Sequence, residues 1–217
     1  QKGIYMEKYL TSGCDRIMMF GSIQKVMPAN QNKYYSIQII DKKCILCGMH
    51  LPSRIYSDHQ ERRNIVIDRI VEDINELEMK IENTIILGDV NENPYDVGCL
   101  NATKFHGISS GADAEKGSRT VMSKTFKMFY NPMWNLFGDF RYPPGTYYHN
   151  GSEPSNSFWN IYDQVMIRPS MRKWFVDNSL KILVRIQEYS LVDKFRHPRK
   201  DISDHLPIVF EIKEENI

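Results

Sequence analysis

The sequence predicts one domain that mixes α and β structure. The chain has 217 residues, of which 41% are hydrophobic and 25% are charged, a balance that suits a packed core rather than a disordered chain or a coiled-coil rod. Short apolar runs near the start are followed by a long stripe with helical spacing and then by another short apolar run. This order of strand, helix and strand is typical of α/β packing.

Three short apolar runs are expected to form the first strands. They are flanked by turn residues or charges and cover Arg16–Phe20, Tyr34–Ile40 and Cys44–Met49. No apolar run approaches the roughly 20 residues that a helix needs to cross a membrane, so no membrane span is expected.

The next segment changes to helical periodicity. Apolar residues recur at spacings of three and four, namely at Ile67, Ile70, Ile74, Leu77 and Ile81. Ser57 and Asp58 are candidate N-caps, because Gln60 and Glu61 follow three residues after each in a capping-box pattern. A helix is therefore expected from about Asp58 to Glu82.

The second half is expected to alternate short strands with long loops. The stretch Glu92–Thr120 is polar and rich in Gly, Asn and Ser, so it predicts loops with a short helix near Tyr95–Leu100, and Tyr142–Thr146 predicts another loop. The expected strands are Thr84–Gly88, Ile161–Ile167, Ile182–Ile186 and Leu206–Ile212.

The four cysteines, Cys14, Cys44, Cys47 and Cys99, are expected to be buried thiols. Cys44 and Cys47 have the CxxC spacing of redox and zinc sites. In a strand, however, positions 44 and 47 point to opposite faces, so the two thiols cannot converge on one metal ion. Reduced thiols favour a cytoplasmic location.

Overall charge does not decide the partner, because the net charge is +1. The stretch Arg168–Lys200 differs, with nine basic and three acidic residues and a net charge of +6. It would either steer a polyanion toward a site or form a solvated face balanced by acidic surface elsewhere. Trp134, Trp159 and Trp174 are expected to pack in the core or at its rim rather than stack on bases.

Polar side chains suited to catalysis lie at the ends of several predicted strands. They are His50, Asp89, Asn91, Asp163, Asp204 and His205. Attack on a phosphate ester needs a positioned water, which Asp89 can orient or deprotonate, and it needs donors to the phosphoryl oxygens, such as Asn91 and the two histidines. It also needs a hard cation, for which Asp204 is a candidate ligand.

Four motifs in order resemble the endonuclease/exonuclease/phosphatase superfamily, the DNase I-like fold. HLPS follows the third predicted strand, GDVN follows a buried strand, YDQV lies on a late strand and SDHLPI precedes the last one. The resemblance covers about residues 16–212. It implies an α+β fold, a four-layer α/β/β/α sandwich, formed as a single domain over residues 1–217.

The resemblance also implies roles for the motif residues. Asp89 would position the attacking water, and Asn91 and His50 would contact the scissile phosphate. Asp163 would pair with His205, and His205 would stabilise the phosphoryl transition state. The implied activity is divalent-metal-dependent phosphoesterase chemistry, on nucleic acid or on a small phosphoester such as a phospholipid head group or inositol phosphate.

The implied metal is Mg²⁺, or Mn²⁺ as its usual substitute, with Asp204 as a ligand. The family also uses an Asn and a metal-binding Glu on two opening strands, and the only early candidate, Glu7, has a different context. We therefore expect the chain to lack the first strands of the family fold, to bind metal poorly and to hydrolyse esters slowly or not at all.

Four further possibilities remain from the sequence. Asn160, three residues before Asp163, and Arg168 are candidates for binding the substrate. A truncated domain could act as a binding module without catalysis. Gly107–Gly111 matches G-x-S-x-G, with Ser109, Asp163 and His205 in the order of an α/β-hydrolase, but its flanks are polar and glycine-broken where such a turn needs a buried strand and a helix. The sequence does not predict the oligomeric state.

Overall fold

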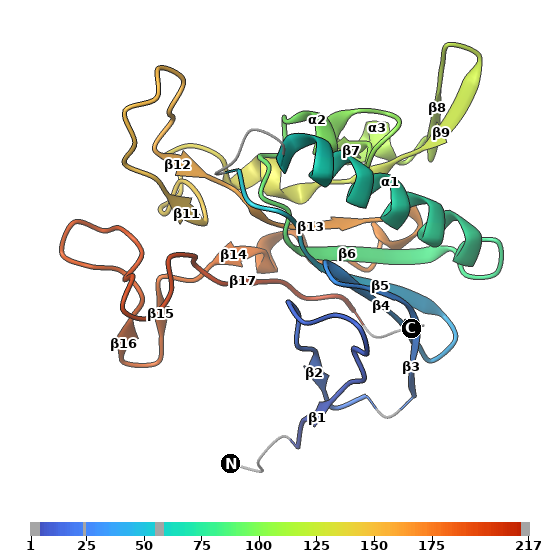
Figure 1. Cartoon of the computed structure of the whole chain (residues 1–217), viewed down its shortest axis with the longest axis horizontal. Helices are drawn as coiled ribbons and strands as arrows, with labels where there is room; N and C mark the ends of the chain where they lie inside the picture. Colours follow the sequence, from blue (N-terminus) through green and yellow to red (C-terminus); the bar gives the residue numbers. More distant parts are fainter. Residues whose placement is uncertain (1–4, 24, 55–58, 214–217) are drawn as a thin grey trace.

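The computed structural model describes residues 5–23, 25–54 and 59–213 and is built on one mixed sheet (Figure 1). The order of the seven strands is β3-β4-β5-β6-β13-β10-β7. Their bounds are β3 Val26–Asn32, β4 Tyr35–Ile40, β5 Cys44–His50, β6 Asn83–Asp89, β13 Asp163–Ile167, β10 Phe129–Tyr130 and β7 Gly107–Ile108. β5 and β6 run parallel, and β13 is antiparallel to β6.

The remaining elements are short, apart from one helix. The helices are α1 (His59–Leu77), α2 (Val97–Leu100) and α3 (Gly111–Ala114), with 3₁₀ turns η1 (Pro132–Leu136), η2 (Pro169–Met171) and η3 (Asp177–Ser179). Five strand pairs lie outside the main sheet: β1 (Glu7–Lys8) with β2 (Phe20–Gly21), β8 (Ser118–Val121) with β9 (Lys124–Lys127), β11 (Tyr147–Tyr148) with β12 (Trp159–Asn160), β14 (Lys181–Ile182) with β17 (Ile208–Val209), and β15 (Arg185–Ile186) with β16 (Tyr189–Ser190).

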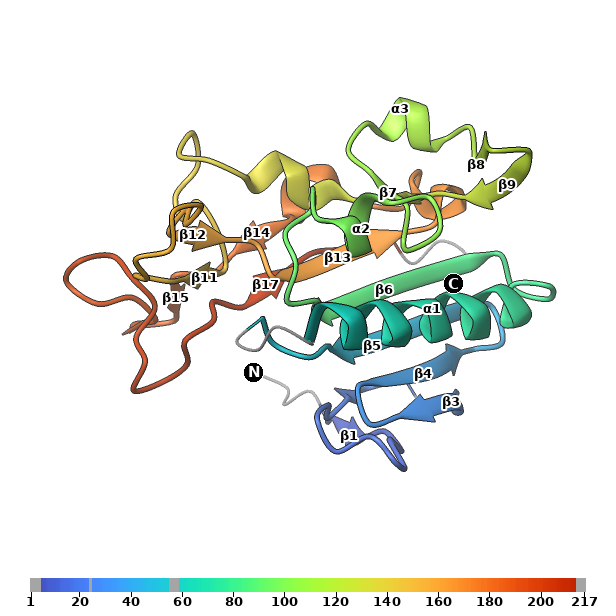
Figure 2. The ribbon, with the colours of Figure 1, turned by 45° about the horizontal axis from the view of Figure 1, so that its top comes forward.

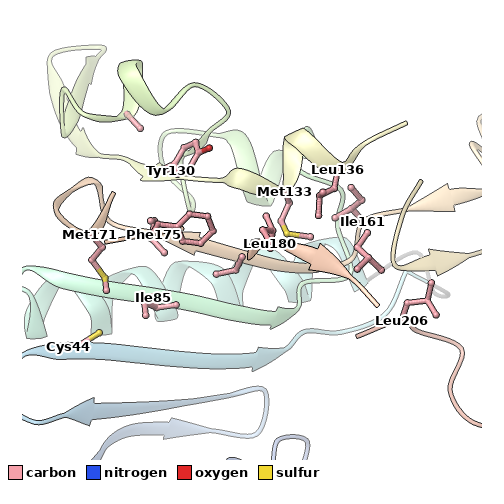
Figure 3. Packing of buried hydrophobic residues seen from close by; sticks show 14 of the residues in the cluster. Cys44, Ile85, Tyr130, Met133, Leu136, Ile161, Met171, Phe175, Leu180 and Leu206 are labelled. Atoms are coloured by element: carbon pink, nitrogen blue, oxygen red, sulfur yellow. The ribbon is translucent and has the colours of Figure 1, made fainter. Parts of the chain in front are cut away.

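The main sheet has an apolar core on each face, because neighbouring residues of a strand point to opposite sides. Ile86 packs in the cluster that includes the buried stripe of α1, which covers one face of the sheet (Figure 2). Ile85, the residue before it, packs in the other cluster, with Leu180 and Leu206 (Figure 3). The sheet and its helical layer confirm the expected α+β class.

The second sheet of the expected sandwich is small in the described part of the chain. On the face opposite α1, Ile182 of β14 belongs to the buried cluster and Ile208 of β17 packs against it. These two strands form a sheet of only two strands. A full second sheet with helices beyond it is therefore not formed by residues 5–23, 25–54 and 59–213.

The best predicted elements are those with the most regular burial. The strands expected at Tyr34–Ile40, Cys44–Met49 and Thr84–Gly88 are β4, β5 and β6 within one residue at either end, and the short helix near Tyr95–Leu100 is α2. α1 ends at Leu77, so the expectation of helix to Glu82 was too long. The expected caps Ser57 and Asp58 lie outside the described residues.

Three expected strands are wrong or much shorter. Only Phe20 of Arg16–Phe20 is in a strand, and its ring is exposed, whereas Ile17 and Met19 are half-buried and lie close to Gly48 of β5. Ile182–Ile186 is divided between β14 and β15, and only two residues of Leu206–Ile212 form β17. Ile161–Ile167 starts later, as β13 at Asp163.

Two structured segments were missed for identifiable reasons. β3 contains Pro28, which cannot donate to a ladder, but β3 is an edge strand with a register shift between Pro28 and Gln31, where that donor is not needed. The β8–β9 hairpin turns at Met122 and Ser123 with φ of 48° and 64°, without the glycine that usually marks such a turn.

The four cysteines are free and buried, as expected. Cys44 and Cys47 belong to the two different core clusters, which confirms that they point to opposite faces of the sheet. None of the described helices is long and apolar enough to cross a membrane.

The packing of α1 gives a stability prediction. Ile70→Ala should lower the free energy of unfolding by about 2–5 kcal/mol, because Ile70 is fully buried and its removal leaves a cavity. Ile65→Ala on the same helix is a matched control, since Ile65 is 63% exposed, and should change stability by less than about 0.5 kcal/mol. Urea unfolding measures both, and equal effects would contradict the described face of α1.

Candidate active site

The register of three central strands aligns three of the expected site residues. His50 pairs with Asp89 between β5 and β6, and Asp89 pairs with Asp163 between β6 and β13. Residues directly opposite one another in a sheet project to the same face, with neighbouring strands about 4.8 Å apart. The three side chains therefore stand in one row at one end of the sheet.

A glycine permits this row to form. Gly88, directly before Asp89, has φ of +130°, and a Cβ atom there would clash with the carbonyl oxygen of Met49 in β5. Only glycine adopts this backbone conformation without strain. The GD pair of the sequence motif thus serves the close approach of β5 and β6 at the site.

The carboxylate of Asp89 is held by Asn91. The backbone N–H of Asn91 donates to Oδ1 of Asp89 at 2.8 Å, and Nδ2 of Asn91 donates to Oδ2 at 3.0 Å. Nδ2 also donates to the carbonyl oxygen of Leu51 at 3.1 Å. Both amide hydrogens of Asn91 are therefore used within the protein, and its geometry suits orienting Asp89 better than the expected contact with a phosphate.

His205 and Asp163 form the pair that the sequence motifs imply. Nδ1 of His205 lies 2.7 Å from Oδ2 of Asp163, and this contact fixes the orientation of the imidazole. Thr146 supports the pair, because its Oγ1 accepts the backbone N–H of Asp163 and its carbonyl accepts that of Leu206. The ring of Tyr147 packs against His205 with 4.8 Å between centroids.

Burial and neighbouring charges set the protonation of the row. Burial, and then the charge of Asp163, raise the pKa of Asp89 to about 7. Burial opposes the charged form of His205, but the hydrogen bond and charge of Asp163 outweigh it and raise the pKa of His205 to about 9. Burial lowers the pKa of His50, whose Nε2 lies 3.6 Å from Oδ2 of Asp89. At neutral pH the site thus holds a cationic His205 and a neutral His50.

The side chains of the site do not fit a resident Mg²⁺. Mg²⁺ binds oxygen ligands in a near-octahedral arrangement. Within the described ranges, no group of three or more His, Cys, Asp or Glu side chains is placed to hold a metal ion. Asp204 is exposed, and Asp89 already accepts two hydrogen bonds from Asn91.

Two other expected site residues have structural partners. Asn160 is buried, and its Oδ1 accepts a hydrogen bond from Asn93 at 2.9 Å. Arg168 lies just past the far end of β13, where it forms a buried ion pair with Glu78 at 2.6 Å. The expected role of Arg168 in substrate binding conflicts with this position, because its charge is already neutralised inside the protein.

Ser109 does not join Asp163 and His205. It follows β7, and the ladder from β7 through β10 meets β13 at Ile167, four residues from Asp163. With about 3.3 Å per residue and about 4.8 Å per strand, the separation is on the order of 15 Å. The hydrolase triad suggested by the sequence is therefore wrong.

Sequence reasoning missed the residues that hold the site from behind. Thr146 is the last residue of a segment interpreted as loop, and Tyr147 follows it; their contribution comes from backbone bonds and ring contacts with distant residues. Arg54 was also missed; its side chain pairs with Asp96 at 2.8 Å and lies over the ring of Tyr162, next to Asp163. No local pattern marks these contacts.

Several solved structures are similar to this one. The 3'-5' exonuclease from Neisseria meningitidis is 13% identical, with a TM-score of 0.49 over 89% of this chain and 73% of that one. The AP endonuclease from Archaeoglobus fulgidus is 11% identical, with a TM-score of 0.48 over 89% and 73%. The human Nocturnin catalytic domain is 9% identical, with a TM-score of 0.48 over 95% and 71%.

These three proteins belong to the endonuclease/exonuclease/phosphatase superfamily, which the sequence motifs resemble. No family model matches the chain, and no curated protein matches it either. Similarity this distant carries no functional argument by itself, so the residues of the site carry the functional interpretation.

The raised pKa of Asp89 predicts a pH-dependent stability. The folded state holds its proton up to about pH 7, whereas an unfolded Asp ionises near 3.8, so stability falls as pH rises between these values. Asp89→Asn removes this penalty. The difference in the free energy of unfolding between Asp89→Asn and wild type should therefore shift in favour of the variant by on the order of 2–3 kcal/mol from pH 5 to pH 8.

The substitution also loses hydrogen bonds of Asp89, but this loss lowers stability at both pH values and cancels when the two are compared. Asp113→Asn is the control, since Asp113 is an exposed carboxylate of α3, and it should show no such gain at pH 8. Chemical unfolding at each pH gives the result. An Asp89→Asn difference that is the same at pH 5 and pH 8 would mean that Asp89 ionises normally in the folded protein.

Proposed function

We propose that this domain is a phosphoesterase, which hydrolyses a phosphate ester by direct attack of water on phosphorus. The alignment of His50, Asp89 and Asp163 on adjacent strands, with His205 bound to Asp163, is the observation that supports it. The row combines a carboxylate able to accept a proton with a fixed cationic donor. In-line attack on a phosphorus centre needs both.

Asp89 is assigned the general base. Its pKa near 7 matches the operating pH, which is where a general base is most effective. The water oxygen forms a bond to phosphorus as one water proton passes to Asp89. The bond from phosphorus to the ester oxygen breaks on the opposite side, and the leaving alkoxide takes a proton from solvent. Asn91 acts as a positioning residue that aims the carboxylate.

His205 is assigned the stabilisation of charge. Asp163 accepts its Nδ1–H, and so leaves the other ring N–H of the imidazolium as a donor to a phosphoryl oxygen. A preorganised donor of this kind stabilises charge that builds in the transition state. His50, neutral at pH 7 and beside Asp89, provides a second polar contact for the phosphate group.

A second candidate function is a binding domain that holds a phosphate ester without cleaving it. The described residues favour it in one respect, because they do not assemble three metal-ligating side chains at the site. The cationic His205 would still attract an anion. Binding of inorganic phosphate that depends on His205, together with no hydrolysis by the wild-type chain, would support this function over catalysis.

The catalytic proposal predicts large losses of activity. Asp89→Asn and His205→Ala should each lower kcat/KM for bis(p-nitrophenyl) phosphate by about 10²–10⁴-fold, because each removes a group that acts on the reacting atoms. Assays are run with Mg²⁺ or Mn²⁺ present. Asp113→Asn, an exposed carboxylate on α3, is the matched control and should keep wild-type activity. Variants of Asp89 and His205 that retain activity within threefold would exclude these roles.

Metal dependence is tested separately. Because Asp204 is an exposed carboxylate without two further ligands in the described structure, Mg²⁺ and Mn²⁺ should bind weakly. Asp204→Ala should abolish what binding there is. Calorimetric titration of both proteins measures this, and tight binding that survives the substitution would show that the ligands lie elsewhere in the chain.

A further inference from the structure

Two loops meet beyond the end of the sheet that carries the candidate active site. β11–β12 and β15–β16 lie together on the side where β5 and β6 end (Figures 1 and 2). The hydroxyl of Tyr142 donates to the carbonyl oxygen of Arg196 at 2.5 Å, and the guanidinium of Arg196 lies 3.7 Å from the centroid of the Tyr142 ring. These contacts join the segment before β11 to the segment after β16.

The β11–β12 pair and the segment after β16 present a stack of aromatic rings. The ring of Tyr148 lies on that of His197, with 3.7 Å between centroids and 10° between planes. Phe158 stacks with Tyr148 at 6.3 Å, and Phe195 stacks with His197 at 6.4 Å. Phe158 is 47% exposed and Phe195 is 66% exposed. We call these four residues the ring stack.

A hollow borders the ring stack, and two of its lining residues directly adjoin residues of the candidate active site: Asp204 precedes His205, and Tyr148 follows Tyr147, whose ring packs against His205. Its volume is about 470 Å³, and its wall includes Tyr148, His197 and Asp204. This volume is within the ordinary range of ligand sites in proteins. Asp204 directly precedes His205 in the chain, so a molecule whose phosphate lies at His205 can extend into the hollow.

The hollow has little free charge. Oδ1 of Asp193 accepts the backbone N–H groups of Phe195 and His197, and Asp201 pairs with Arg199 at 2.5 Å. Lys200 and Asp204 are the other charged residues of its lining, so the five charged residues together carry a formal net charge of −1. A space with little net charge and an aromatic wall suits a flat heterocycle, whereas the imidazole of His205, held by Asp163, offers a ring nitrogen to a phosphate.

We propose that the ring stack and the hollow bind an unpaired nucleobase next to the phosphate at His205. The substrate class is then a single-stranded polynucleotide, because stacking needs a base face that a duplex covers. An inositol phosphate or a phospholipid head group has no aromatic ring to place there. This inference rests on the proposed function for the position of the phosphate.

The experiment measures binding without hydrolysis, in the Asp89→Asn background with EDTA. The probe is a short single-stranded DNA with one 2-aminopurine, whose fluorescence falls when it stacks on an aromatic ring. His197→Ala should weaken binding about tenfold or more and remove the quenching, because stacking one base contributes most of this contact. His197→Phe keeps a flat ring, so its affinity for the probe should stay within threefold of that of the protein with His197.

Two comparisons separate stacking from general attraction of an anion. The same strand with an abasic position in place of 2-aminopurine should bind about as weakly as the intact strand binds His197→Ala. Phe140→Ala removes an aromatic ring that is fully exposed outside the ring stack, and it should leave binding unchanged. Thermal melts confirm that each variant is folded.

Equal affinity for the intact and abasic strands, or unchanged binding by folded His197→Ala, overturns the inference. The result is independent of the hydrolysis assay. Stacking that depends on His197 in a protein without phosphoesterase activity would keep the base site and reject only the catalytic proposal. Hydrolysis of bis(p-nitrophenyl) phosphate without base-dependent binding would do the reverse.

Discussion

The close approach of β5 and β6 at Gly88 is the constraint on which the site depends. His50 and Asp89 are the last residues of the parallel strands β5 and β6. They can lie side by side only if the two strands stay paired in register up to their ends. A side chain at position 88 would clash with the backbone of Met49 and push the two strands apart beside His50 and Asp89. β13 then extends the same row from the other side, and with it comes Asp163.

The two carboxylates in the row, Asp89 and Asp163, differ in how closely each contacts His205. The charge of Asp163 disfavours the ionisation of Asp89, and Asp163 itself accepts a direct hydrogen bond from His205. Asp89, left with Asn91 as its donor, keeps a proton to about pH 7. Two carboxylates of the same residue type thus have different environments, because only Asp163 is hydrogen-bonded to His205.

Much of the fold and of the site could be predicted from the sequence, and the exceptions have physical reasons. β4, β5, β6 and α1 were predictable because burial imposes a period on the sequence. The row of site residues was predictable because strand ends display polar side chains. Arg168 was assigned wrongly because its partner Glu78 lies 90 residues away, and counting charges along the chain cannot reveal such a pair. Thr146 was missed because it acts through tertiary backbone bonds.

The order of strands in the main sheet has a consequence for how the molecule forms. β7 and β10 are joined to β6 only through β13, which follows both of them in the chain. During synthesis β7 and β10 therefore emerge before β13, which connects them to the sheet. Until β13 is available they cannot join the sheet, whereas β3 to β6 can already pair. Such long-range closure is slow compared with local pairing. The row of His50, Asp89 and Asp163 is completed by the same insertion, so the candidate site is assembled only once β13 has paired with β6.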